Sequence, residues 1–493
     1  MANFQELKSA GFNFHKENKF DEAEKCYEEA LRLNDKNAEV HNLLGIINLQ
    51  KGNTDLALKW VEKAISLEKN AYFYETLFQV YIKKSDFQKI VDIEHEVEGL
   101  FPTDFSLIFN IALANKNLNN IQDGIYYYKK AIEIDENSYD AWFNLSHLYG
   151  IEGETHEAVK ALEVCRNLKP DDKDTEYFYS IALLRIKDYD RGLKHFEQRF
   201  CKDIAIASQN KTYPNKALYE NLWNGEDISN KTIFVYYEAG FGDIIMFARY
   251  FPLLKQRCKK IILKIPQPLT KLFLENPQLG VDEVIDNFIP ERDLDFDVHI
   301  PMLSLPYALG LKGNNVFIGH EGYLICDENK KLEYNKKCFD TKKMKIGIKW
   351  QGNTYYDVDR VIPTEAFFPL IENLLNTQFY SFQTFEGSEE VKKLTDRYDV
   401  IDIGKGLKDF SMTSAALSNL DLVICNDTSL AHLAGALNIP CIITLPYEVN
   451  WRWHTDLSVC DWYDSVKLFR QKSVGNWKSV FDEVLEVLTK NGF

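Results

Sequence analysis

Residues 11–30 read GFNFHKENKFDEAEKCYEEA, and residues 45–64 read GIINLQKGNTDLALKWVEKA. The two stretches align at a spacing of 34 residues (11 to 45), with glycine matching glycine at the start and alanine matching alanine at the end. Small residues at such positions let two antiparallel helices approach closely, and a period of this length is typical of helix–turn–helix repeats. The sequence therefore predicts a stacked helical array from its first residues onward.

The same register continues to about residue 200, with a disturbance between about residues 72 and 103. Small and apolar residues mark the later units: Gly124, Tyr128, Ala131, Ala158, Leu162, Cys165, Gly192 and Phe196. The tetratricopeptide pattern has Trp, Leu, Tyr and Pro at four positions, and this chain has the same residue types there: Trp142, Leu145, Tyr149 and Pro170. Residues 1–200 thus resemble a tetratricopeptide array of six units, the third degenerate. An ordinary helical bundle with small residues at this spacing is the alternative.

Beyond a polar connector at residues 201–230, the periodicity changes. Apolar runs such as TIFVYY (232–237) and KIGIKW (345–350) alternate with helical stretches, which is typical of βαβ units and parallel sheets. We therefore expect an all-α superhelix followed by an α/β module of two Rossmann-like domains, at residues 231–340 and 341–493. Ligands of such sheets bind at the carboxyl ends of the strands, and two such domains imply a cleft.

The composition excludes several classes of protein. Among 493 residues, 58 are Lys or Arg and 74 are Asp or Glu, and the net charge of -16 disfavours nucleic-acid binding. Nine cysteines form no C-x-x-C pair, so we expect free thiols in a reducing cytosol rather than zinc or disulfides. No run of 18 apolar residues and no signal core is present. We expect a cytoplasmic protein without a membrane span.

The first candidate for chemistry is Gly240–Asp243, between the strand TIFVYY and an apolar helical stretch. Glycines let the backbone turn tightly there, and the following helix offers free N–H groups. A dinucleotide site would need a third glycine, where Ile245 stands, and an acid after the next strand. We therefore exclude nicotinamide and flavin binding. Asp243 either caps the helix or faces the cleft as a base.

The second candidate is NDTSLAHLAG, residues 426–435, again directly after a strand (LDLVIC). Hydroxyl groups and backbone donors gather there at a helix N-terminus, which suits a diphosphate, and His432 can add a donor one turn in. A plain helix cap with a buried histidine is the alternative.

The third candidate is WQGN (350–353) together with Arg360. Arg360 would supply a positive charge to a leaving diphosphate. The alternative is that Arg360 is a solvated side chain on a loop.

The acids Asp293, Asp295 and Asp297 could be mistaken for a metal site. Apolar residues alternate with them along the chain, so we expect them to line the outward face of a half-buried strand.

Several blocks together carry a family resemblance: EAGFGD (238–243), FDVHIPMLSLP (296–306), KWQGN (349–353), NDTSLAHLAGALNIP (426–440), WRWHTD (451–456) and WYDSVKLFRQ (462–471). They resemble the family 9, heptosyltransferase-like glycosyltransferases, and more narrowly the bacterial proteins that join tetratricopeptide repeats to such a domain. The resemblance implies the GT-B architecture of two facing Rossmann-like domains. It also implies inverting transfer from a nucleotide sugar without a metal or other cofactor.

The resemblance assigns roles by position. Asp243 matches the catalytic base, Asp427, Thr428 and His432 match the loop that binds the donor diphosphate, and Arg360 stands roughly where relatives use a lysine. Further donor-binding residues are expected at Gly240, Gly242, Asn353, Gln383 and Ser429. The residue that contacts the nucleotide ribose has no clear counterpart, and Gln383, Glu386 and Glu389 are all in range.

The expected function is transfer of a sugar to an acceptor hydroxyl, on a protein or peptide that the repeats recruit. The domain of residues 231–340 would take the acceptor side, and residues 341–493 the nucleotide-sugar side. Trp142, Tyr149 and Tyr177 lie on predicted inner helices of the array, where a peptide would bind. Two alternatives stay open: a non-catalytic scaffold with a degenerate transferase domain, and an enzyme that acts on a glycan.

Overall fold

The computed structural model describes residues 2–201, 221–286, 294–353, 359–454 and 460–490. The chain forms two compact units, Met1–Asp171 and Asp172–Phe493. The division falls inside the predicted helical array, before its last helical pair, so that this pair belongs to the same unit as the α/β part. Within the described ranges, every helix is too short or too polar to cross a membrane.

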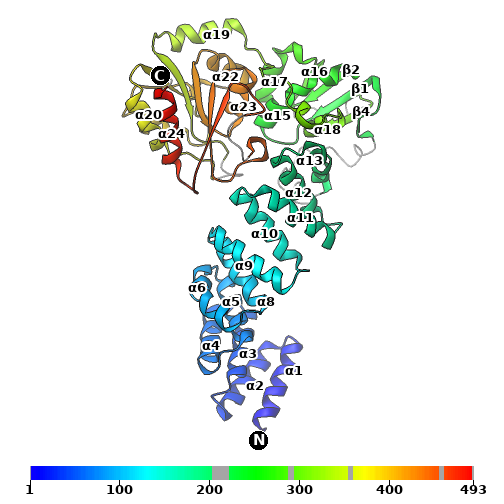
Figure 1. Cartoon of the computed structure of the whole chain (residues 1–493), viewed down its shortest axis with the longest axis vertical. Coiled ribbons are helices and arrows are strands. Elements are labelled where there is room, and N and C mark those ends of the chain that lie inside the picture. Colours follow the sequence, from blue (N-terminus) through cyan, green and yellow to red (C-terminus); the bar gives the residue numbers. More distant parts are fainter. Residues whose placement is uncertain (1, 202–220, 287–293, 354–358, 455–459, 491–493) are drawn as a thin grey trace. The chain divides into compact units, whose positions relative to one another are not determined.

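The first unit consists of antiparallel helical pairs stacked one after another (Figure 1). Its helices are α1 (Phe4–Lys16), α2 (Phe20–Leu33), α3 (Ala38–Gln50), α4 (Thr54–Leu67), α5 (Ala71–Lys83), α6 (Phe87–Val91), α7 (Glu94–Leu100), α8 (Phe105–Asn117), α9 (Ile121–Ile134), α10 (Tyr139–Glu152) and α11 (Thr155–Leu168). In the third pair the second helix is split into α6 and α7, which agrees with the disturbed period. The buried Glu94 at the start of α7 accepts a hydrogen bond from Asn115 Nδ2 at 2.7 Å.

Close approach explains the repeated small residues. A Cβ on Gly45 of α3 would lie 2.4 Å from Cγ2 of Val61 on α4, so only glycine fits there. The first helix of each of the six pairs also begins at a polar cap, whose side chain accepts a hydrogen bond from a backbone N–H two or three residues further on. The caps recur at spacings of 33 or 34 residues: Asn3, Asn37, Asn70, Asp104, Ser138 and Asp172.

The second unit begins with the sixth helical pair, α12 (Lys173–Arg185) and α13 (Tyr189–Phe196), followed by the 3₁₀ turn η1 (Glu197–Cys201). A four-stranded parallel sheet follows in the order β3-β2-β1-β4. Its strands are β1 (Ile228–Tyr236), β2 (Cys258–Lys264), β3 (Glu283–Ile285) and β4 (Val298–Pro301), and its helices are α15 (Phe241–Phe247), α16 (Phe251–Lys255), α17 (Gln267–Leu274) and α18 (Leu305–Ala308).

A second parallel sheet has six strands in the order β10-β9-β8-β5-β6-β7. Its strands are β5 (Met344–Lys349), β6 (Thr377–Ser381), β7 (Val400–Asp402), β8 (Leu422–Asn426), β9 (Cys441–Leu445) and β10 (Val466–Arg470), and its helices are α20 (Phe368–Asn373), α21 (Val391–Thr395), α22 (Phe410–Leu417), α23 (Ser429–Ala436) and α24 (Trp477–Lys490). Helix α19 (Glu328–Tyr334) precedes β5. This is the doubly wound order, and its topological switch point lies between β5 and β8.

The two predicted Rossmann-like sheets are therefore present, with small differences in their limits. β1 starts at Ile228, inside the predicted connector, and β4 starts at Val298 rather than among the preceding acids. Strands β3, which has only three residues, and β10 were not predicted from the sequence. A buried cluster of apolar side chains joins the sixth helical pair, the four-stranded sheet and one face of the six-stranded sheet, and it includes Leu193, Phe196, Ile233, Met246 and Leu433.

Candidate active site

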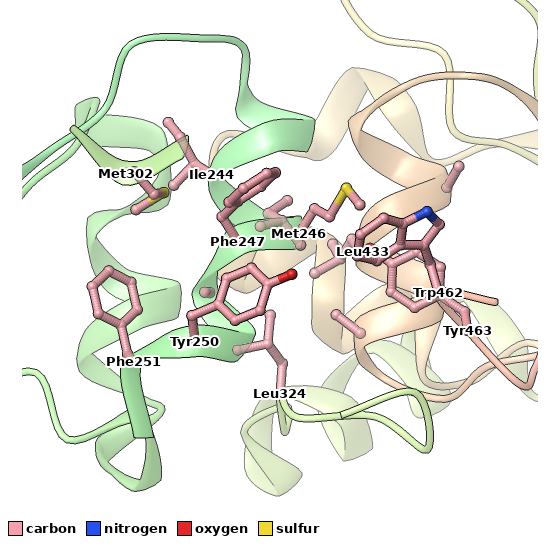
Figure 2. Packing of buried hydrophobic residues seen from close by; sticks show 14 of the residues in the cluster. Ile244, Met246, Phe247, Tyr250, Phe251, Met302, Leu324, Leu433, Trp462 and Tyr463 are labelled. Carbon is pink, nitrogen blue, oxygen red and sulfur yellow. The ribbon is translucent and has the colours of Figure 1, made fainter. Parts of the chain in front are cut away.

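Helices α15 and α23 meet in the second unit, and each begins directly after a strand, β1 or β8. Figure 2 shows Met246 of α15 directed toward Leu433 of α23 and the ring of Trp462. A Cβ on Gly242 would come 2.7 Å from Cδ2 of His432, so glycine is required for the contact. The first two candidate segments, far apart in sequence, thus lie side by side. Gly242 acts there as a packing position between the two helices.

Asp243 is the third residue of α15, and both of its carboxylate oxygens have partners. Oδ2 accepts a hydrogen bond of 3.0 Å from the backbone N–H of Gly240, which caps the helix. Oδ1 forms an ion pair with Nη2 of Arg452, on the 3₁₀ turn η12 (Trp451–Trp453) after β9. The Asp243 side chain keeps about 20% of its surface exposed. The two interpretations of Asp243 are therefore compatible, because it caps the helix and still reaches solvent.

The sixth helical pair reaches the same place. Burial raises the pKa of the Tyr177 hydroxyl on α12, while the charges of Arg452 and Arg199 oppose that rise and the charge of Asp243 adds to it. The ring of Tyr177 also stacks on Phe196, with centroids 6.3 Å apart. Tyr177 therefore lies within electrostatic reach of the Asp243–Arg452 pair.

Glu238, a second carboxylate just after β1, is fully committed to other partners. Its two oxygens accept hydrogen bonds of 2.9 and 2.7 Å from Nε and Nη2 of Arg199, and Oε1 also accepts one from the N–H of Leu303. Both charged side chains are buried. The carboxylate raises the pKa of the Arg199 guanidinium, which stays charged. Glu238 thus anchors the end of the sixth pair to the β1–α15 turn and is no candidate for a base.

The β8–α23 loop brings the predicted Asp427 and Arg360 together. Nη1 of Arg360 lies 3.0 Å from Oδ2 of Asp427, and the carbonyl of Arg360 accepts a hydrogen bond of 2.9 Å from Nδ2 of Asn426. Thr428 is the N-cap of α23 in an extended conformation, and its side chain does not cap the helix. Ser429 is the first residue of that helix and is half-buried. The guanidinium of Arg360 therefore lies close to the N-terminus of α23.

His432, one turn into α23, is held in a fixed orientation. Nδ1 lies 3.0 Å from the hydroxyl of Tyr463, Nε2 lies 3.9 Å from Oδ1 of Asp427, and the ring stacks on Trp453 at 5.2 Å. Burial lowers the pKa of His432 to about 4. The imidazole is therefore neutral at neutral pH, and it can offer one N–H but no positive charge.

The end of β5 adjoins the same loop. A Cβ on Gly352 would lie 3.0 Å from Cγ2 of Thr428, so the exposed Asn353 follows directly after a contact with the β8–α23 loop. Lys349, the last residue of β5, is buried, and burial lowers the pKa of its ammonium group to about 8. It remains largely charged at pH 7 and adds positive potential at this edge of the sheet.

Gln383, a predicted donor-binding residue, holds two loops together and also lines a cavity. Its Oε1 accepts hydrogen bonds from the N–H groups of Trp350 and Gln351, at 3.2 and 3.1 Å, and its Nε2 donates to the carbonyls of Gln351 and Glu386 at 3.0 and 2.6 Å. The side chain is buried. The amide therefore ties the loops after β5 and β6 together, while Glu386 and Glu389 are exposed.

A cavity of about 510 Å³ opens at the carboxyl ends of β6 and β7. Its lining includes Thr384 and Phe385 after β6, and Asp402, Lys405 and Leu407 at and after the end of β7. The ring of Phe385 is 85% exposed. Gln383, whose amide ties the loops after β5 and β6 together, also lines this cavity.

The predicted strand position of the acids is wrong for Asp295 and Asp297, because β4 begins only at Val298 and both residues precede it. Asp295 and Asp297 are exposed and the residues between and beside them are more buried, as the alternation predicts. Oδ2 of Asp297 accepts a hydrogen bond of 2.7 Å from the N–H of Thr232. Asp293 lies outside the described residues. Within the described part of the chain, no three His, Cys, Asp or Glu side chains form a group that could hold a metal ion.

Family profiles match both parts of the chain. Tetratricopeptide repeat profiles match residues 15–71, 105–138 and 127–160, and the profile of Glycosyltransferase family 9 (heptosyltransferase) matches residues 324–445, from before β5 to the end of β9. The chain joins tetratricopeptide repeats to a family 9 glycosyltransferase domain. The protein is thus a glycosyltransferase.

Similar solved structures include both kinds of protein. The family 9 glycosyl transferase from Veillonella parvula is 13% identical with a TM-score of 0.41, and the match covers 55% of this chain and 92% of that one. The tetratricopeptide protein YrrB is 18% identical with a TM-score of 0.32, over 34% of this chain and 88% of that one. The tetratricopeptide protein TTC0263 from Thermus thermophilus is 20% identical with a TM-score of 0.29, and the match covers 37% of this chain and 99% of that one. No curated protein sequence matches the chain.

The family 9 profile covers Arg360, Asp427 and His432 but ends before Arg452. Arg452 stands in the WRWHTD block (451–456), but the resemblance gave this arginine no role. The only signal in the sequence is the pair of tryptophans on either side of it, which anchor the turn. The partner of Arg452 lies 209 residues away, so no local pattern could indicate it.

Proposed function

We propose that this glycosyltransferase is an inverting, metal-independent enzyme that moves a sugar from a nucleotide sugar to a hydroxyl group of a protein or peptide. The observation that carries the proposal is the contact between α15 and α23. It brings the carboxylate of Asp243 near the loop that holds Asp427, Thr428 and His432. A base close to a diphosphate-binding helix N-terminus suits a single displacement at the anomeric carbon.

In that reaction the acceptor oxygen bonds to the anomeric carbon as the bond from that carbon to the diphosphate oxygen breaks. Asp243 takes the proton of the acceptor hydroxyl, and the nucleoside diphosphate leaves with the bonding electrons. Attack opposite to the leaving group inverts the anomeric configuration. The helix N-terminus of α23 and the guanidinium of Arg360 would stabilise the charge on the diphosphate.

The charges around the diphosphate site support this arrangement. A bare carboxylate beside a diphosphate would repel it, but Asp427 is paired with Arg360 and so orients a cation. Lys349 adds a second positive charge at the end of β5. These fixed cations offer the charge compensation that a metal supplies in other transferases, which supports metal independence. The cavity beyond β6 and β7 has the position and the volume for the nucleoside.

The repeats would recruit the acceptor. Tyr149 of α10 is buried in the core of the first unit and Trp142 is half-buried, so Tyr149 offers no surface to a peptide. Phe12 of α1 and Tyr72 of α5 are instead 46% and 49% exposed on first helices of their pairs. Exposed aromatic rings on a stacked array suit an extended peptide. The eight described free cysteines support a reducing, cytoplasmic location.

Asp243→Asn tests the proposal. Asparagine keeps an oxygen that can accept the hydrogen bond from Gly240, but it is not a base, so turnover should fall by about 10² to 10⁴-fold while the nucleoside diphosphate binds as before. A panel of UDP-, GDP- and ADP-sugars in thermal shift would first identify the donor. Wild-type turnover in Asp243→Asn would show that Asp243 is only a cap. Transfer to a glycan in preference to any protein would replace the proposed acceptor class.

A further inference from the structure

The ion pair between Asp243 and Arg452 joins two parts of the second unit. Asp243 belongs to α15, after the first strand of the four-stranded sheet, and Arg452 belongs to η12, after β9 of the six-stranded sheet. The Arg452 side chain is only 11% exposed. A charged hydrogen bond at such a place is stronger and more directional than one on an open surface.

The segment that carries Arg452 is rigid. Trp451 and Trp453 are buried, the carbonyl of Arg452 accepts a hydrogen bond of 2.7 Å from Nε1 of Trp462, and the guanidinium lies 4.6 Å from the centroid of the Trp451 ring. Nη1 donates to Oδ1 of Asn450 at 2.8 Å. The guanidinium therefore has a fixed place before any substrate binds.

The carboxylate of Asp243 is correspondingly held at both oxygens, by Gly240 at Oδ2 and by Arg452 at Oδ1. Each carboxylate oxygen can accept about two hydrogen bonds, so each keeps the capacity to accept one more from an acceptor hydroxyl. Without Arg452 the cap alone would fix the group, and the carboxylate could turn about its Cβ–Cγ bond. A displacement of about 1 Å in a reacting group can cost about 10²-fold in rate.

Resting on the proposed function, we infer that Arg452 is a positioning residue of the transfer reaction, which holds the base Asp243 in the orientation that receives the acceptor proton. It contacts the base and not the substrate. Its loss should therefore lower kcat and leave the binding of the donor nucleotide unchanged.

The experiment compares Arg452→Ala and Arg452→Lys with a matched control, Arg185→Ala. Arg185 holds the same segment, since its Nη2 donates to the carbonyl of Val449 at 2.8 Å and pairs with Glu448, but it does not contact Asp243. Release of nucleoside diphosphate from the donor found in the sugar panel gives kcat and KM. Calorimetry with the matching nucleoside diphosphate gives Kd.

We expect Arg452→Ala to lower kcat by about 10 to 100-fold, with KM and Kd within about twofold of the wild type. Arg452→Lys should keep more of the rate, and low concentrations of guanidinium chloride should partly restore Arg452→Ala but not Asp243→Asn. An unchanged kcat in Arg452→Ala would overturn the inference. So would a weakened Kd at constant kcat, which would make Arg452 a ligand of the diphosphate.

A purely structural role would also overturn the inference, and it would appear as equal losses in Arg452→Ala and Arg185→Ala without rescue by guanidinium. A different result would contradict the proposed function itself. If Asp243→Asn turns over like the wild type, the base assignment is wrong, whereas a normal rate in Arg452→Ala beside a slow Asp243→Asn contradicts only the role of Arg452. A wild-type protein that turns over no nucleotide sugar would contradict both.

Discussion

Gly242 of α15 packs against His432 of α23 so closely that a Cβ on Gly242 would lie 2.7 Å from Cδ2 of the imidazole. The imidazole cannot rotate freely, because it is hydrogen-bonded to the hydroxyl of Tyr463 and stacked on the ring of Trp453. Helices α15 and α23, which carry Asp243 and His432, therefore approach each other through the one residue type without a side chain. The distance between the two halves of the site depends on that contact.

Gly242→Ala should push the two helices apart. An added methyl group in a packed contact costs about 1 to 3 kcal/mol, so the melting temperature should fall by several degrees and turnover should fall with it. Gly240→Ala is the control for stability, because a Cβ there would have only Oδ2 of Asp243 nearby, at 3.7 Å. If both variants have the melting temperature of the wild type, a methyl group fits between Gly242 and His432 and the two helices are not in close contact there.

Truncation should separate the first five helical pairs from the sixth. Removal of residues 1–171 leaves the second unit whole, so the protein should fold and bind nucleotide but lose transfer to a protein acceptor. Removal of residues 1–200 also deletes Arg199 and takes Leu193 and Phe196 out of the apolar core of the second unit. An unpaired Glu238 alone would cost about 3 to 5 kcal/mol, so this variant should not fold.

Circular dichroism and nucleotide calorimetry on the two truncated proteins check these expectations. A well-folded product of the longer deletion would mean that the sixth pair is dispensable. Equal transfer to protein acceptors by the shorter deletion would point to a small or glycan acceptor.

Stability should decrease at acid pH because of two buried histidines. Burial lowers the pKa of His299 and of His432 to about 4, from about 6.5 in the unfolded chain. Between those values the unfolded chain takes up protons that the folded protein does not. The free energy of unfolding therefore falls as the pH drops from 6.5 to 4, by roughly 3 kcal/mol for each ring, and it is unaffected by these groups above pH 6.5.

His299→Phe isolates one of the two contributions. His299 lies on β4 against Tyr236, and among the described residues neither ring nitrogen has a hydrogen-bond partner. Phenylalanine keeps the aromatic contact and removes the proton-linked group. Urea unfolding at pH 7 and pH 4.5 should show a smaller loss of stability in the variant than in the wild type, and an equal loss would mean that His299 is not the titrating group.

Metal removal should leave the enzyme active. If the α23 N-terminus and Arg360 hold the diphosphate, turnover in EDTA should stay within about twofold of its value without chelator. Mg²⁺ or Mn²⁺ added afterwards should bring no gain. Full loss of turnover in EDTA with recovery on Mn²⁺ would instead favour a metal site at Asp293, Asp295 and Asp297.

Local patterns account for what the sequence predicted. The period of 34 residues predicted the helical pairs and the disturbed third pair, and the apolar runs TIFVYY (232–237) and KIGIKW (345–350) overlap β1 and β5. The loops at Asp243 and Asp427 follow strands, as expected. The polar caps from Asn3 to Asp172 also lie at the repeat spacing and mark the start of each pair in the sequence. Each of these features is a local pattern of residue types, and the repeat shows it again at a fixed spacing along the chain.

The sequence by itself thus determined the order of the elements, the repeat and the loops that bear Asp243 and Asp427. Only the tertiary structure decided the partners. It paired Asp243 with Arg452 across 209 residues, committed Glu238 to Arg199, used Gln383 as a clamp between loops and joined the sixth helical pair to the α/β unit. Helix periodicity, strand alternation and caps arise from near neighbours along the chain. An ion pair or a buried amide depends on which distant segments the fold brings together, and no local pattern contains that information.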